Sequence, residues 1–173
     1  MFQSERFPRS PTQQDVFAAC EAFKVVPTFR CDWLDWMRHG SEIISLERGL
    51  RFGEPWLATM LSQETEKKLG GIVARSSAGV LGYIVYEISP PQLTVRRIAV
   101  SADHQRQGVG TSLINHLKEE RLWQNECREI RALVSEHDLA SQSFLSSQEF
   151  VISLAIKGAG LYSEDLYGFS FER

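Results

Sequence analysis

The sequence has few cysteines and no cluster of metal-ligating residues. Three cysteines occur among 173 residues, Cys20, Cys31 and Cys127, and no two of them have the CxxC spacing of a zinc or redox motif. The four histidines are scattered as well. We therefore expect reduced core thiols rather than disulfides, no metal, and a cytoplasmic, reducing compartment.

Long apolar runs and an excess of one charge are also missing. No apolar stretch approaches the roughly 20 residues that cross a bilayer, and residues 1–15 lack the apolar core of a signal peptide. The formal net charge is −3, which gives no general attraction to nucleic acid or to an anionic membrane. With 43% hydrophobic and 24% charged residues and no internal repeat, the chain is predicted to form one globular domain without nucleic-acid or membrane partners.

One stretch, residues 93–120, organises the rest of the sequence. Residues 93–100 (LTVRRIAV) are rich in β-branched and apolar side chains and predict a buried strand. After the turn 101–110 (SADHQRQGVG), apolar residues recur at helical spacing, which leaves Lys118 on the expected solvent face. The loop from Gln105 to Gly110 thus opens directly into a helix N-terminus, where free N–H groups and the helix dipole favour an anion such as phosphate.

The remaining elements alternate strands with helices. We expect a first strand within residues 28–37, a helix from Ser41 and another from Pro55. A hairpin joined by SSAG follows, with strands over 71–75 and 80–88. Three later strands are expected over 129–135, 150–156 and 166–171, and a helix over 138–147. Residues 1–27 are predicted to be an extension with one short helix, which could cover a sheet edge, contact a partner or be unrelated to the fold.

The loop spacing resembles the acyl-CoA pyrophosphate loop of the GCN5-related N-acetyltransferase (GNAT) family. Gln105, Gly108 and Gly110 match its signature, and the alternative is an ordinary tight turn. The resemblance covers roughly residues 28–172 and implies a GNAT domain over 28–173. It implies an α/β fold: a central mixed, mostly antiparallel sheet with a splayed pair of parallel strands, flanked by helices.

The resemblance also implies where acetyl-CoA would bind, as a co-substrate. Its pantetheine arm would pair with the backbone of the strand that ends in Ile98, Ala99 and Val100. Its pyrophosphate would lie on the loop and the first helical turn: Gln105, Arg106, Gln107, Gly108, Val109, Gly110 and Thr111. Asp138 either holds the pantetheine amide or simply caps the helix that follows it.

Softer features are similar to the ribosomal-protein alanine N-acetyltransferase branch. These are residues 41–47 (SEIISLE) followed by Pro55-Trp56, residues 139–150, and residues 162–167 (YSEDLY). Trp56 is either a core residue or part of the acceptor groove. The branch implies a direct, ternary-complex acetyl transfer to a primary amine, with a protein N-terminal α-amino group as one candidate acceptor; a homodimer is left open.

The acid and base of that branch have no counterpart here. The matching positions carry Leu133 at the base, Asp138 at an asparagine and Leu145 at the acid. We expect both leucines to face the thioester and make the reacting centre apolar. Glu136 is a candidate base or a solvated strand-end residue, and Tyr162 is a candidate acid or an aromatic that orders its loop.

Two other functions compete with the enzyme hypothesis. The leucines are also compatible with a catalytically degenerate acyl-CoA-binding protein that acts in interaction or sensing. A nucleotide-binding domain unrelated to acyl transfer is disfavoured, because the loop lacks the lysine of a phosphate-loop ATPase and the third glycine of a dinucleotide loop.

Overall fold

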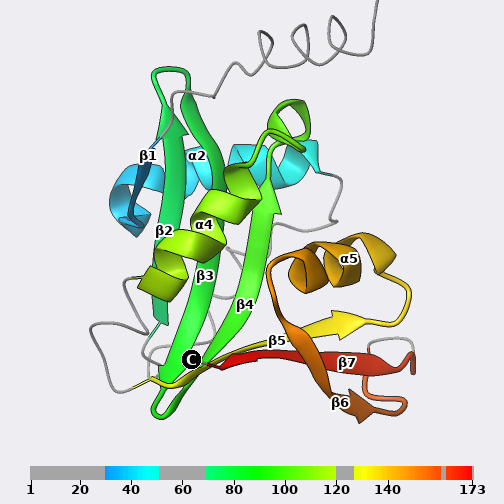
Figure 1. Cartoon of the computed structure of the whole chain (residues 1–173). Coiled ribbons are helices and arrows are strands. Elements are labelled where there is room, and N and C mark those ends of the chain that lie inside the picture. The colour runs from blue at the N-terminus through cyan, green and yellow to red at the C-terminus, as the bar shows by residue number, and fades with distance from the viewer. Residues whose placement is uncertain (1–29, 51–68, 120–126, 161–162, 173) are drawn as a thin grey trace, which may run out of the picture.

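The computed structural model describes residues 30–50, 69–119, 127–160 and 163–172. The extension over 1–27, the helix expected from Pro55, and Tyr162 lie outside these residues. The family resemblance predicted a mixed, mostly antiparallel sheet flanked by helices, and Figure 1 confirms this architecture.

The sheet has seven strands in the order β1-β2-β3-β4-β5-β7-β6. All neighbouring pairs are antiparallel except β4 and β5, which are parallel. The strands are β1 (Arg30–Trp33), β2 (Leu69–Ser76), β3 (Gly79–Ser89), β4 (Gln92–Val100), β5 (Glu129–Ser135), β6 (Val151–Ile156) and β7 (Leu166–Glu172). Each strand overlaps a segment expected from period-two or continuous apolar patterning.

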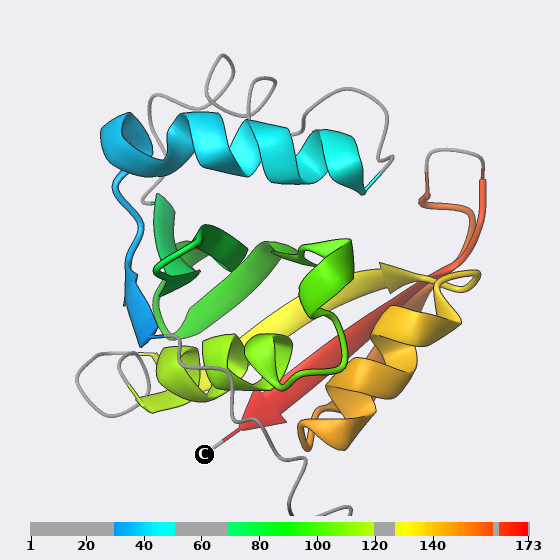
Figure 2. The same cartoon turned by 90° about the horizontal axis from the view of Figure 1, so that it is seen from above.

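Helices cover both faces of the sheet. Figure 2 shows α2 (Trp36–Gly49) on one face, with α4 (Val109–Leu117) and α5 (Leu139–Ser147) on the other. On the α4 side the core includes Ile84, Leu113 and Ile130, each fully buried. On the α2 side, Ile43 packs with Tyr83 in a separate buried cluster.

The two parallel strands separate partway along their length. Residues Gln92–Val95 of β4 pair with Glu129–Ala132 of β5, and the ladder stops there. In β4 a bulge at Arg96 shifts the register with β3, since Val85 pairs with Arg97 but Tyr86 pairs with Val95. Figure 1 shows β4 and β5 diverging beyond this point, which we call the fork. The predicted splayed parallel pair is therefore present.

Candidate functional site

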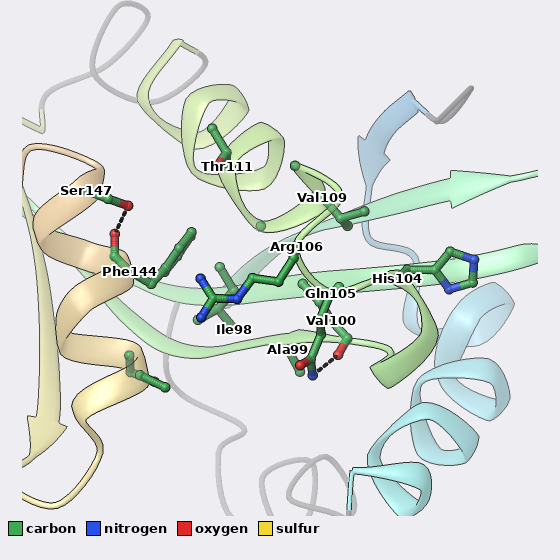
Figure 3. Close-up of a pocket in the computed structure, with 14 residues that line it drawn as sticks. Ile98, Ala99, Val100, His104, Gln105, Arg106, Val109, Thr111, Phe144 and Ser147 are labelled. Carbon is green, nitrogen blue, oxygen red and sulfur yellow. Dashed lines mark hydrogen bonds between the residues drawn. The ribbon is translucent and has the colours of Figure 1, made fainter. Parts of the chain in front are cut away.

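A cavity of about 550 Å³ lies beside the fork on the α4 and α5 side (Figure 3). Four segments form its walls: the end of β4, the loop after it, the first turn of α4 and one side of α5. The lining residues are Ile98, Ala99, Val100, His104, Gln105, Arg106, Gly108, Val109, Gly110, Thr111, Ala140, Ser141, Phe144 and Ser147. The structure thus brings together all the predicted coenzyme residues except Gln107 and Asp138.

The loop backbone directs N–H groups at this cavity. Gly108 is the N-cap of α4 in the left-handed conformation (φ 82°, ψ 0°), and no side chain caps the helix. The first helical bond runs from the Ser112 N–H to the Gly108 carbonyl (2.9 Å). The N–H groups of Val109, Gly110 and Thr111 precede that bond, so they have no intrahelical acceptor. Together with the positive end of the helix dipole they form an anion site.

Two glutamines stiffen the loop through their side-chain amides. Gln105 Nε2 donates to the carbonyl of Val100 (3.2 Å), which ties the loop to the end of β4. Gln107 Nε2 donates to the Asp103 carbonyl (2.9 Å), so its side chain braces the turn instead of lining the cavity. Figure 3 shows the Arg106 side chain extending from this loop toward α5.

Gly110 lies where α4 and α5 approach each other closely. A Cβ atom at Gly110 would lie 3.2 Å from the Phe144 ring, closer than ordinary carbon contact. The glycine therefore allows Phe144 to form one wall of the cavity directly against the phosphate-facing turn.

Lys118 links the same two helices at their far ends. Its Nζ donates to the Gln148 carbonyl (2.7 Å) and lies 3.6 Å from the centroid of the Phe171 ring. Burial lowers the pKa of Lys118, and the nearby Glu149 carboxylate opposes that shift. The expectation that Lys118 faces solvent is wrong, because only 14% of its side chain is exposed.

The two leucines at the expected acid and base positions lie in different environments. Leu133 is 52% exposed and is the first β5 residue beyond the ladder with β4. Leu145 is 3% exposed and belongs to the core between α5 and the sheet. The expectation that both face the reacting centre is therefore wrong for Leu145, whose side chain is needed to pack α5.

Two other proposed site residues, Glu136 and Asp138, have structural partners. The Glu136 carboxylate accepts the Asp165 N–H (3.0 Å), and the Glu136 N–H donates to the Asp165 carbonyl (2.9 Å), so Glu136 fixes the segment that enters β7. Asp138 caps α5 by accepting from the Ser141 N–H (3.0 Å) and hydroxyl (2.6 Å). Of the two interpretations of Asp138, the structure thus shows hydrogen bonds for the helix cap.

A buried polar network on the α2 face was not found from the sequence. The Tyr83 hydroxyl donates to the carboxylate of Glu47, whose side chain is 1% exposed, and Arg97 Nε lies 3.7 Å from the same carboxylate. Burial is the main cause that raises the pKa of Tyr83 well above its usual range, and the Glu47 carboxylate is the second. Arg97 directly precedes Ile98, which lines the cavity, so the network fixes the part of β4 that borders the fork.

Neither a cluster of metal-ligating residues nor a membrane-spanning helix occurs within the described ranges. No group of three or more His, Cys, Asp or Glu residues there has the arrangement of a metal site. Likewise, no helix in the described part of the chain has the length and apolarity needed to cross a membrane.

Comparisons with known proteins agree with this geometry. The model of the acetyltransferase (GNAT) family matches residues 33–150. The ribosomal-protein-S18-alanine N-acetyltransferase from Escherichia coli is similar in structure, with a TM-score of 0.71, 18% identity, and coverage of 84% of this chain and 94% of that one. NAA60 from Arabidopsis thaliana in complex with acetyl-CoA is similar with a TM-score of 0.68 and 13% identity, and the match covers 84% of this chain and 98% of that one. Ard1 from Thermoplasma volcanium is similar with a TM-score of 0.68 and 16% identity, and the match covers 83% of this chain and 97% of that one. A sequence comparison with curated proteins found no match.

Proposed function

Because the chain belongs to the GNAT acetyltransferase family, we propose that it transfers the acetyl group of acetyl-CoA to the α-amino group of a peptide or protein. The observation that carries this proposal is the cavity at the uncapped N-terminus of α4, open beside the fork. Acetyl transfer in general follows from the family. The peptide acceptor is supported by the names of similar structures, an alanine N-acetyltransferase among them.

The residues around the cavity fit acetyl-CoA. The N–H groups of Val109, Gly110 and Thr111 suit the pyrophosphate. Among the described residues outside the loop and the start of α4, none comes within 4 Å of the position that a Cβ at Gly108 would take, so the space above the loop is open. The backbone of β4 from Ile98 to Val100 has no β5 partner and can pair with the amides of the pantetheine arm. When bound, the coenzyme supplies an activated acetyl thioester.

Near the thioester the chain would orient the two reactants and provide an apolar surface. Few of its side chains there can transfer a proton. Leu133 cannot accept a proton, but its desolvating surface lowers the pKa of an incoming ammonium and so favours the free amine. We propose Glu136 as the base and Tyr162 as the acid that protonates the leaving thiolate. Orientation of amine and thioester supplies much of the remaining acceleration.

Transfer itself is tested with acetyl-CoA and a panel of N-terminal peptides and small amines. We expect free thiol to accumulate with peptides, and mass spectrometry to place the acetyl group on the peptide α-amine. If calorimetry detects acetyl-CoA binding but no acceptor yields thiol or acetylated product, the chain is the degenerate binding protein instead.

The proton chemistry is tested by two isosteric changes, Glu136→Gln and Tyr162→Phe. A glutamine oxygen can still accept the Asp165 N–H, so Glu136→Gln should preserve folding while it removes the base. We expect each change to lower kcat by about 100-fold or more, with the dissociation constant for acetyl-CoA unchanged, as for groups used in the transition state. An unchanged kcat in either variant would leave that residue with only its structural role.

The compartment and the domain boundary are also proposals. Cys31 and Cys127 are free thiols, which suits the reducing cytoplasm. We assign residues 28–173 to the acetyltransferase domain and residues 1–27 to an extension, consistent with a family match that begins at residue 33.

A further inference from the structure

Two half-exposed leucines lie in one row across the sheet, on the face opposite α5. Gly168 of β7 pairs with Leu133 of β5 on one side and with Leu154 of β6 on the other. Directly opposed residues share a face of the sheet, so the two leucines flank the glycine. Leu133 is 52% exposed and Leu154 is 49% exposed. We call these three residues the leucine row.

The absence of a side chain at Gly168 leaves room for both leucine side chains to approach the space above it. A Cβ atom at this glycine would lie 3.0 Å from Leu154 Cβ and 3.7 Å from Leu133 Cδ2. Leu154 Cδ2 also lies 3.7 Å from that position, so both side chains lean toward the glycine and together expose apolar area on this face. Val151, 63% exposed, extends this surface in the next row, opposite Ser170.

Leu133 is exposed because its face of β5 is not covered at the fork, where the pairing with β4 has ended. Its neighbours Ala132 and Val134 point to the other face and are buried. A half-exposed leucine beside the fork leaves apolar area in water that a bound apolar group would cover.

The leucine row is continuous with the proposed coenzyme site. Leu133 is the first β5 residue past the ladder with β4, so it borders the fork. The cavity reaches the same fork from the opposite face of the sheet, through Ile98 and Ala99. An acetyl group carried into the fork from the cavity would therefore meet, on the far face, an acceptor lying against Leu133.

We propose that the leucine row binds the first side chain of the acceptor peptide, and that the preferred acceptors begin with a large apolar residue such as methionine, leucine or phenylalanine. This inference rests on the proposed function and names its substrate class. An apolar first side chain gains by leaving water against the leucines, whereas alanine or serine offers little area to bury. The α-amine next to that side chain is then held at the fork.

The test compares kcat/KM for peptides that differ only in their first residue. We expect methionine, leucine or phenylalanine to exceed alanine and serine by about tenfold or more in the wild-type protein, the discrimination that a few methylenes provide. Leu133→Ser and Leu154→Ser should each remove most of that preference while leaving the dissociation constant for acetyl-CoA unchanged. Leu139→Ser is the matched control, because Leu139 is 70% exposed at the start of α5 and outside the leucine row; its preference should match wild type.

Several results would overturn the inference. The inference fails if peptides are acetylated without any first-residue preference, or if the preference survives in both leucine variants. Either result leaves the proposed function intact and removes the role of the leucine row. A concentration-dependent dimer in sedimentation that Leu133→Ser dissociates would assign the surface to a second copy of the chain. Acetyl-CoA binding without transfer to any peptide would instead defeat the proposed function itself. Thermal unfolding of each variant checks that the exposed serines leave the fold unchanged.

Discussion

Gly108→Asp is expected to abolish acetyl-CoA binding without unfolding the protein. The carboxylate would lie at the N-cap of α4, where the pyrophosphate is proposed to bind, and would repel it at short range. Aspartate tolerates the left-handed conformation better than most residues and is favourable at a helix N-terminus. No described residue beyond the adjoining loop and helix backbone lies within 4 Å of the new Cβ. We expect the dissociation constant, measured by calorimetry, to rise by at least about a hundredfold.

Gly108→Asn separates charge from bulk in this experiment. Asparagine has nearly the same shape and also tolerates the positive φ, so it adds the side chain without the negative charge. Its effect should be clearly smaller than that of aspartate, and the difference should shrink at high salt. A folded Gly108→Asp protein that binds acetyl-CoA as tightly as wild type would show that the pyrophosphate does not lie on this loop.

Glu47→Ala is expected to cost about 3–5 kcal/mol of unfolding free energy. The change removes the buried carboxylate that lies 3.7 Å from Nε of Arg97, whose side chain is only 21% exposed, and it removes the acceptor of the Tyr83 hydroxyl. Tyr83→Phe removes only the hydroxyl, so we expect a smaller loss of about 1–3 kcal/mol. Urea unfolding at neutral pH measures both, and a loss below about 1 kcal/mol for Glu47→Ala would mean that the network contributes little.

Alkaline pH tests the same network independently. The pKa of Tyr83 is raised in the folded protein by burial and by Glu47, whereas an unfolded tyrosine titrates near pH 10. The stabilisation is therefore complete below about pH 10 and is lost as pH rises beyond it, because only the unfolded chain releases the proton. Tyr83→Phe should flatten this alkaline decline, and an equal decline in both proteins would assign it to other groups.

The amino-acid sequence by itself determined the local parts of the coenzyme site. The strand that ends at Val100, the turn with Gly108 and the amphipathic α4 are contiguous. Each is specified by neighbouring residues: the strand and helix by the periodicity of apolar side chains, and the turn by the backbone freedom of glycine. The cap at Asp138 is local in the same way, since its acceptor bond spans three residues. The resemblance to a family with a splayed sheet then placed these parts in a fold.

Only the tertiary structure decided which side chains meet across elements. Leu133 and Leu145 are the same residue type, yet β5 leaves one at the surface of the fork and α5 buries the other, because exposure depends on what covers each face. Lys118 packs over the Phe171 ring, with only 14% of its side chain exposed, although its helical position alone suggests solvent. Glu47 and Tyr83 are 36 residues apart in the chain and bond only because α2 packs on β3. Contacts of this kind are set by packing between distant segments, which no local pattern encodes.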